Sequence, residues 1–350
     1  MRAYLLKRWF LVSLLVLIPG GLALGGNYGA ALSGLLESRL LPPLITSVVL
    51  FLMSFSLDGA QLKRSLRYPG PVLLAFVVNL GVVPLLGWAM MHVQLQLDFA
   101  FGLMIAASVP CTMAAASVWT RKAGGNDAVS LFVTVSTNGL CFVITPFWLN
   151  LTTTGHVALD FWTMFWRLVI TVLIPTLLGQ LARLLSPAAE FARRHKTAMG
   201  VAAQVCILTI IFIAACTAGL KLAAGGPSPS AAGVALVWGC CIVLHVVAMG
   251  VGLLASRLLG FARADLIAVV FAGSQKTIPI GLLIATDAAM FGDPNLLGPG
   301  QGLPFVVFPM LMYHASQLFI DTAVADHFAA EASAATSTDD ADAHNCDVTA

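Results

Sequence analysis

Long apolar runs separated by short polar loops are the dominant pattern of this sequence. A helix needs about 20 predominantly apolar residues to cross the hydrocarbon core of a bilayer, and ten runs have about that length. The pattern therefore predicts an all-α membrane protein with ten transmembrane helices. We place these helices at residues 9–25, 40–57, 70–91, 98–120, 127–149, 160–182, 197–220, 231–256, 265–287 and 303–325.

The segment after the tenth run has a different composition. Residues 331–350 are rich in Ala, Ser, Thr and Asp and contain no Lys or Arg. A segment with so few apolar side chains cannot bury enough surface to fold. We therefore expect a ten-helix domain over residues 1–328, followed by a disordered cytoplasmic tail over residues 329–350.

Basic residues occur mainly in alternate loops. With the N-terminus in the cytoplasm, 14 of the 18 Lys and Arg residues fall in cytoplasmic segments, and only Arg39 and Lys221 fall in outer segments. This asymmetry follows the positive-inside rule, so we expect a multi-pass protein of the cell membrane with both termini in the cytoplasm. The first run is counted as a retained helix rather than a signal peptide, because without it the later basic loops would lie on the wrong side. The cytoplasmic set is Arg2, Lys7, Arg8, Lys63, Arg64, Arg67, Arg121, Lys122, Arg183, Arg193, Arg194, Lys196, Arg257 and Arg263.

Composition supports the membrane interpretation and excludes several classes of function. Of the 350 residues, 59% are apolar and only 10% are charged, whereas a soluble domain carries about 25% charged residues. The net charge of +2 argues against a nucleic-acid partner. Six of the seven cysteines fall in apolar runs and none forms a C-x-x-C pair, so they are expected to be packing residues. The sequence has no H-E-x-x-H or G-x-S-x-G motif, so we expect neither an intramembrane enzyme nor a cofactor.

The ten runs divide into two halves with one interrupted helix in each. Five helices per half place the second half upside-down relative to the first, and such inverted repeats, here about 1–155 and 156–328, are typical of secondary transporters. The interruptions are expected at residues 107–112 and 272–279, which contain Pro110 and Pro279. Proline has no N–H to continue a helix, and in lipid the freed carbonyls need a partner, which could be an ion or a solute group.

Lys276 is the most informative single residue. It lies near the middle of the ninth run, where a charge costs at least about 2.5–3.5 kcal/mol and commonly marks a polar cavity. Pairing with helix carbonyls is the structural alternative. Arg167 lies closer to a helix end, so we expect its long side chain to reach the lipid headgroups. His245 and His314 also fall in apolar runs, where packing is the commoner role, and no Asp or Glu is expected in the middle of any helix.

Two motifs resemble a known family. Residues 271–277, with the sequence FAGSQKT, and residues 309–318, with the sequence PMLMYHASQL, resemble the ninth and tenth helices of the bile acid:sodium symporter family, in its SBF-like branch. Residues 110–126 resemble the fourth helix of that family and its turn into the fifth. The resemblance covers residues 5–328. It implies a panel of helices 1, 2, 6 and 7 and a core of helices 3–5 and 8–10, with broken helices 4 and 9 crossing in the core.

The resemblance also implies an ion-binding set. The family's acidic ligand corresponds to Phe271, and Lys276 replaces a neighbouring Asn. Because a hard cation prefers oxygen ligands, usually with a carboxylate, sodium coupling is left open. Either the Lys276 ammonium does the electrostatic work of a bound ion, or Lys276 itself binds and releases a proton. The ion-binding residues carried over from the family are Asn79, Ser117, Ser130, Thr134 and Gln275.

Together these features predict a secondary active transporter of a small organic anion that works by alternating access. A fixed ammonium and the N-termini of two half-helices would favour a negatively charged group. The alternatives are a proton-coupled or uncoupled carrier, and a membrane scaffold or sensor that transports nothing. The substrate-binding residues that we expect are Pro110, Thr112, Lys276, Thr277, Pro279 and His314.

Overall fold

Helix is the only regular structure in the described part of the chain. The computed structural model describes residues 9–347 except 37, 39, 58–68, 114, 154–156, 158, 226–227, 288 and 292–304. Its elements are α2 (Trp9–Tyr28), η1 (Gly29–Leu32), α3 (Ser33–Leu36), α4 (Leu41–Ser56), α6 (Pro69–Val77), η2 (Val78–Val82), α7 (Val83–Met91), α8 (Leu97–Ser108), α9 (Ala116–Lys122), α10 (Asp127–Thr153), α11 (Phe161–Leu168), η3 (Val169–Leu173), α12 (Ile174–Ala182), α13 (Ser186–Arg194), α14 (Lys196–Ala223), α15 (Ala231–Leu258), α16 (Arg263–Ser274), α17 (Ile278–Thr286) and α18 (Phe308–Asp347).

Six helical segments in the described part of the chain are long and apolar enough to cross a membrane. They are Pro69–Met91, Asp127–Thr153, Phe161–Ala182, Lys196–Ala223, Ala231–Leu258 and Arg263–Thr286. Three shorter apolar helices are Val12–Tyr28, Leu41–Ser56 and Leu97–Ser108. The protein is therefore a multi-pass membrane protein. The full count of ten spans and the inverted repeat remain predictions. Several basic residues used to predict the orientation, at positions 2, 7, 8, 39, 63, 64 and 67, lie outside the described residues.

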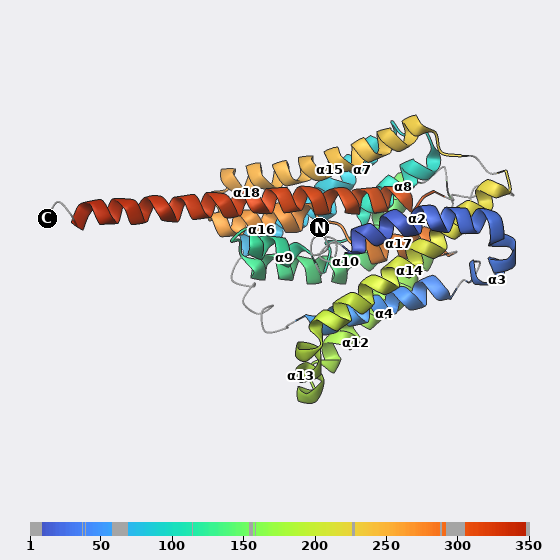
Figure 1. Cartoon of the computed structure of the whole chain (residues 1–350), viewed down its shortest axis with the longest axis horizontal. Coiled ribbons are helices and arrows are strands. Elements are labelled where there is room, and N and C mark those ends of the chain that lie inside the picture. The colour runs from blue at the N-terminus through green and yellow to red at the C-terminus, as the bar shows by residue number, and fades with distance from the viewer. Residues whose placement is uncertain are drawn as a thin grey trace.

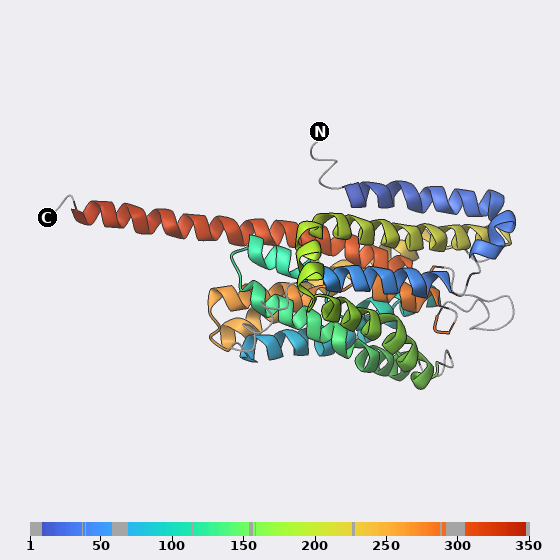
Figure 2. The same cartoon turned by 90° about the horizontal axis from the view of Figure 1, so that it is seen from below.

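The helices pack in two groups (Figures 1 and 2). One group, which we call the panel group, consists of α2, α4, α14 and the α11–η3–α12 span. The other, the core group, consists of α8, α9, α10, α15, α16, α17, α18 and the α6–η2–α7 span. The α17 helix contacts both α4 and α14 from the core side, so the second half of the ninth predicted helix lies where the groups meet.

Glycines allow the closest packing within the panel group. A Cβ atom on Gly25 of α2 would lie 1.9 Å from the carbonyl oxygen of Cys216, and one on Gly219 of α14 would lie 2.1 Å from that of Leu22. Small residues at such contacts let two membrane helices approach until their backbones touch. Figure 2 shows α14 running alongside α2, and Figure 1 shows the two helices crossing at an angle.

Pro84 shapes the third predicted helix. It follows η2, a π-helical turn, and it leaves the carbonyl of Leu80, four residues earlier, without its intrahelical donor. The indole Nε1 of Trp148, on α10, donates a hydrogen bond of 2.8 Å to that oxygen. A neighbouring helix therefore satisfies the carbonyl, as the absence of water in a bilayer requires.

Pro175 has the same effect in the sixth predicted helix. It follows the π-helical turn η3, and the carbonyl of Thr171 accepts a hydrogen bond of 3.2 Å from the Ser47 hydroxyl on α4. This helix begins after Asp160, whose carboxylate caps the N–H of Thr163 at 2.7 Å. Hydrogen bonds from the Thr163 hydroxyl and then from its N–H hold the pKa of the Asp160 carboxyl below its usual range.

The C-terminal segment differs from the predicted disordered tail. Helix α18 continues to Asp347 instead of ending near residue 328, and its last part projects beyond the other helices (Figure 1). The reason lies in the composition. Ala has the highest intrinsic helix propensity, and residues 329–347 are rich in Ala, so backbone propensity favours helix where few side chains are apolar.

Candidate functional site

Two interrupted helices cross in the core group. Helix α8 ends at Ser108 and α9 begins at Ala116, whereas α16 ends at Ser274 and α17 begins at Ile278. The two interruptions, which we call the first and second break, fall where the prolines predicted them. They contact each other directly, because the N–H of Thr277 donates to the carbonyl of Pro110 at 2.9 Å.

Side chains of neighbouring helices satisfy the backbone at the second break. The Asn79 amide Nδ2, from η2, donates to the carbonyls of Ala272, Gly273 and Gln275 at 3.1, 3.2 and 2.9 Å. The Gln317 amide, from α18, both accepts from the N–H of Lys276 and donates to its carbonyl at 3.0 Å. The freed backbone groups that we expected an ion or solute to satisfy thus have partners within the protein.

The first break is supported in the same way from α10. Thr145 donates to the carbonyl of Ser108 at 2.9 Å, and Asn138 donates to that of Cys111 at 2.8 Å. The hydroxyl of Thr134 lies 3.5 Å from the Thr112 carbonyl and 3.4 Å from the Cys111 thiol. At both breaks, therefore, side chains of neighbouring helices bond backbone groups that lie outside the helical hydrogen-bond pattern.

Lys276 connects the two breaks from the buried side. Its side chain is fully buried, and its ammonium Nζ donates to the carbonyl oxygen of Asn79 at 2.6 Å, to the Asn79 amide Oδ1 at 3.3 Å and to the carbonyl oxygen of Val109 at 2.9 Å. An ammonium group has three donors and no acceptor. These three oxygens satisfy it without a carboxylate, so the carbonyl pairing considered from the sequence is present.

A cavity of about 480 Å³ lies between the two groups, on the exposed side of the breaks. Of the predicted substrate-binding residues, Thr112, Pro279 and His314 line it, whereas Pro110, Lys276 and Thr277 lie buried behind it. The polar lining is sparse, and among the described residues Lys122, on α9, is the one Lys, Arg, Asp or Glu in it. The lining residues are Phe10, Leu52, Met53, Ser56, Thr112, Met113, Ala115, Trp119, Lys122, Gly200, Ala203, Gln204, Ile207, Ile278, Pro279, His314, Leu318 and Thr322.

The predicted ion-binding residues do not form one cluster. Asn79 and Gln275 lie at the second break and Thr134 lies at the first. The hydroxyl of Ser130 pairs with that of Thr120 at 2.6 Å, and Ser117 lies half-buried at the second position of α9. Among the hydrogen bonds of the described residues, none joins the hydroxyls of Ser117, Ser130 and Thr134 to one another. At and beside the two breaks, three buried side-chain oxygens have no hydrogen-bond partner among the described residues: Gln275 Oε1, Thr277 Oγ1 and Asn138 Oδ1.

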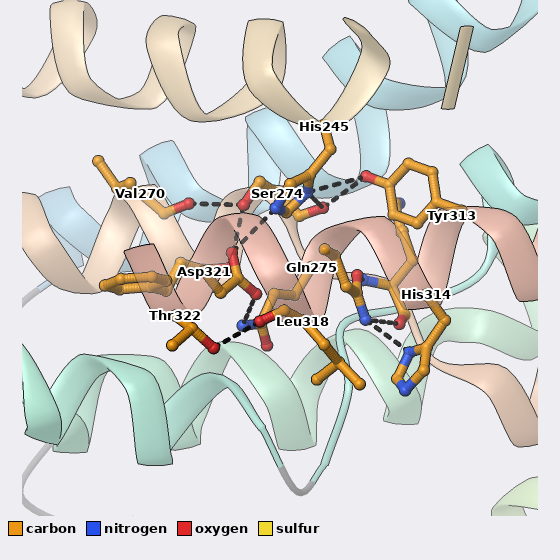
Figure 3. Close-up of polar contacts among 12 residues, drawn as sticks. His245, Val270, Ser274, Gln275, Tyr313, His314, Leu318, Asp321 and Thr322 are labelled. Atoms are coloured by element: carbon orange, nitrogen blue, oxygen red, sulfur yellow. Dashed lines mark hydrogen bonds and ion pairs between the residues drawn. The ribbon is translucent and has the colours of Figure 1, made fainter. Parts of the chain in front are cut away.

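A buried carboxylate is the feature that the sequence interpretation missed. Asp321 of α18 is fully buried and accepts from His245 Nε2 at 2.9 Å and from Gln275 Nε2 at 2.5 Å (Figure 3). The expectation that no Asp or Glu lies in the middle of any helix was therefore wrong, since Asp321 lies well within α18. The run of apolar residues suggested a helix ending near residue 325, but α18 continues, and α15 and α16 cover Asp321. A signal was available in the sequence, because Asp321 lies one helical turn after Gln317 and therefore on the same face of the helix as that motif residue.

Arg167 also differs from its prediction. Its guanidinium Nε lies 2.5 Å from the carboxylate of Asp287, which directly follows α17 and is buried. An ion pair between the panel group and the core group therefore takes the place of the expected headgroup anchor. The Asp287 carboxylate also caps the N–H of Ala289 at 2.9 Å.

Comparison with known proteins finds a matching transporter family and relatives that include named cotransporters. A profile of the SBF-like CPA transporter family matches residues 8–330. "Sodium/bile acid cotransporter 7" of Xenopus tropicalis is 23% identical over 327 residues, which are 90% of this chain and 89% of the relative. An uncharacterized protein of Pseudomonas aeruginosa is 26% identical over 298 residues, covering 81% and 84% of the two chains. "Probable sodium/metabolite cotransporter BASS4, chloroplastic" of Arabidopsis thaliana is 27% identical over 262 residues, which are 71% of this chain but only 57% of the relative.

The family profile spans both breaks, Lys276 and the Asp321 carboxylate. The resemblance indicated by residues 271–277 and 309–318 is thus confirmed over nearly the whole chain. Family membership agrees with the membrane-spanning helices and with a cavity at the crossing of two broken helices. The chain belongs to the SBF-like CPA transporter family, a family of membrane transporters.

Proposed function

We propose that this protein is a secondary transporter that carries an amphipathic organic anion across the cell membrane by alternating access. The observation that carries the proposal is the cavity between the two helix groups, which reaches the crossing of the broken helices. Transport sites at interrupted helices are a recurring arrangement in secondary transporters. In this proposal the panel group and the core group, each built from helices of both inverted repeats, move against each other, and the cavity faces the cytoplasm, where both termini lie.

The lining favours an amphipathic substrate with a negative end. Ile278 and Pro279, the first residues of α17, line the cavity, so the positive end of that helix dipole faces it. Lys122 adds a positive side chain to the lining, and apolar residues form most of the described wall. A bile acid, the class named for the Xenopus relative, combines such features, and the Arabidopsis relative is named for the broader class of metabolites.

We propose that the Lys276 ammonium takes the place of a bound sodium ion. Two carbonyl oxygens and one amide oxygen surround Nζ at hydrogen-bond distance, and oxygen atoms of this kind are what a hard cation would need. Two unit charges 4 Å apart repel by about 4 kcal/mol at an effective dielectric constant of 20. The ammonium and a sodium ion at the same oxygens would therefore exclude each other, and uptake should not require sodium.

Uptake by purified protein in proteoliposomes tests the proposal. The probes are tritiated taurocholate and a set of labelled mono- and dicarboxylates, measured at fixed pH with sodium or with choline as the only cation. We expect uptake of at least one probe at equal rates in both salts, and loss of that uptake in Lys276→Gln. A sodium requirement would defeat the proposed role of Lys276. Absence of uptake for every probe would favour a scaffold or sensor.

A further inference from the structure

A second polar cluster lies behind the broken helix, away from the cavity. It consists of His245 from α15, Ser274 at the end of α16, and Tyr313 and Asp321 from α18, and all four residues are fully buried (Figure 3). None of them lines the cavity. A buried carboxylate and imidazole are costly to desolvate. Because neither side chain borders the cavity, substrate binding there does not explain why they are buried.

The hydrogen-bond partners of the His245 ring suggest a function for this cluster. An ionised carboxylate only accepts hydrogen bonds, so Nε2 donates its proton to Asp321 at 2.9 Å. On the other side of the ring, Nδ1 lies 3.4 Å from the Ser274 carbonyl oxygen and 3.4 Å from the Tyr313 hydroxyl. The single proton of that hydroxyl is already donated to Ser274 at 2.8 Å. Both ring nitrogens therefore face acceptors, which is the arrangement that an imidazolium needs and a neutral imidazole does not.

We propose that His245 and Asp321 form a proton-binding site and that this proton is the coupling ion of transport; this inference rests on the proposed transport function. In the loaded state His245 carries protons on both nitrogens and forms an ion pair with Asp321. On release, the Nδ1–H bond breaks, its electron pair stays on nitrogen and the proton passes to water. The Tyr313 hydroxyl then turns its proton from the Ser274 carbonyl to Nδ1.

This change reaches the second break through Ser274. Its carbonyl stands at the end of α16, where no intrahelical N–H is available, and Tyr313 is its main donor. When Tyr313 turns to Nδ1, the carbonyl loses that donor, and the geometry of residues 274–277 becomes free to change. Proton release on the buried side is thereby linked to the break that borders the cavity.

The charged and titratable neighbours are few. From the second break, Lys276 is linked to Asp321 through Asn79 and Gln275. The thiols of Cys111, at the first break, and Cys241, on α15, are titratable groups that are also buried in the core group. Helix α16 contributes Arg263 and Asp265 only at its opposite end.

With Lys276 charged and Asp321 ionised, loading a proton adds one positive charge to the core. That charge offsets the negative charge of an organic anion carried in the cavity. Symport of one proton with one monoanion would then move no net charge through the protein.

The site is tested by nitrogen-15 spectra of histidine-labelled protein in nanodiscs. The protein has seven histidines, and the His245 signals are those lost in His245→Gln or, if that variant does not fold, those shifted in Tyr313→Phe. We expect the His245 signals to change from those of an imidazolium to those of a neutral imidazole as the pH is raised. The change should shift in Tyr313→Phe and stay the same in the control His92→Gln, since His92 is exposed. A His245 ring that keeps one form throughout would overturn the proposal.

Uptake of the same labelled probes with an imposed pH gradient gives a second measurement. One pH unit supports up to about tenfold accumulation of a solute carried with one proton. We expect accumulation in the wild type and in His92→Gln, and equal concentrations on both sides in Asp321→Asn. Uptake that equilibrates without accumulation in the wild type would contradict proton coupling while leaving transport intact. If no probe enters, the transport function itself fails, and the spectra alone decide whether the proton site exists.

Discussion

At the scale of single residues, the chemistry of the site depends on one ammonium group. The Nζ of Lys276 has one oxygen for each of its three N–H donors. Two of these oxygens belong to Asn79, on the π-helical turn, and the third belongs to Val109, at the first break. These oxygens therefore compensate the buried charge of Lys276. Through them, the side chain also links the third predicted helix to both breaks.

Replacing Lys276 with Ala should expose this dual role. The change opens a space lined by the oxygens of Asn79 and Val109 and leaves buried acceptors unsatisfied, at a cost of about 1–3 kcal/mol each. We expect a lower melting temperature in choline chloride and partial recovery in sodium chloride, because sodium can enter the vacated space. Thermal unfolding of the purified variant in the two salts measures this difference.

The matched control for that experiment is Lys122→Ala. The Lys122 ammonium is well exposed and pairs with Asp326, so its loss should change stability little and equally in both salts. A variant of Lys276 that unfolds at the same temperature with sodium and with choline would argue that its oxygens are not a cation site. Stabilisation of the wild type by sodium would argue that the ion binds elsewhere.

The two breaks and Lys276 could be predicted because prolines and a charge are conspicuous within an apolar run. The burial of Asp321 was harder to predict, because this residue lies near the end of the tenth run. Whether such a residue is buried depends on which neighbouring helices cover it, and this is a tertiary property. The oxygens around Lys276 were also invisible, since Asn79 and Val109 lie far from it in sequence.

At the scale of the helices, prolines introduce kinks that other helices must complete. Pro84 and Pro175 were visible in the sequence, but the π-helical turns before them were not, since a π-turn depends on how the surrounding helices hold the segment. The donors that satisfy the freed carbonyls, Trp148 and Ser47, come from other helices. Kink geometry is therefore shared between helices rather than encoded by proline alone.

The contact between Trp148 and Leu80 can be tested by a double-mutant cycle with Pro84. Trp148→Phe removes the donor and should destabilise the protein by about 1–3 kcal/mol, since a buried carbonyl is left unpaired. Pro84→Ala supplies an N–H that can bond the Leu80 carbonyl within the helix. We expect Trp148→Phe to cost much less in the Pro84→Ala background, as measured by unfolding in a mild detergent. Equal costs in both backgrounds would show that Trp148 contributes only packing.

At the scale of the whole molecule, the orientation in the membrane follows from the distribution of basic residues. We expect the C-terminal end of α18 to lie in the cytoplasm. A cysteine placed at residue 340 by Asp340→Cys, in a background without other cysteines, should react with a membrane-impermeant thiol reagent only after the cells are permeabilised. Labelling in intact cells would reverse the predicted topology.

The link between Arg167 and Asp287 is the last feature at this scale. Arg167 belongs to the panel group, and Asp287 follows α17 at the end that faces away from the cavity lining. The Asp287 side chain is 1% exposed, so separating the groups at this point would leave a buried charge unpaired. The ion pair should therefore hold the outer side closed while the cavity is open on the other side.

Removing the pair should favour the outward-open state. If the link contributes about 1.4 kcal/mol, its loss shifts the equilibrium about tenfold. We expect Asp287→Asn and Arg167→Gln to increase the rate at which an impermeant thiol reagent, added outside, labels a cavity cysteine introduced by Thr112→Cys. The exchanged pair, Arg167→Asp with Asp287→Arg, should bring the rate back towards that of the wild type. Arg183→Gln is the control, because Arg183 bonds the carbonyl of Phe55 within the panel group. Labelling that is no faster in either single variant than in this control would mean that the ion pair stabilises the fold without governing access to the cavity.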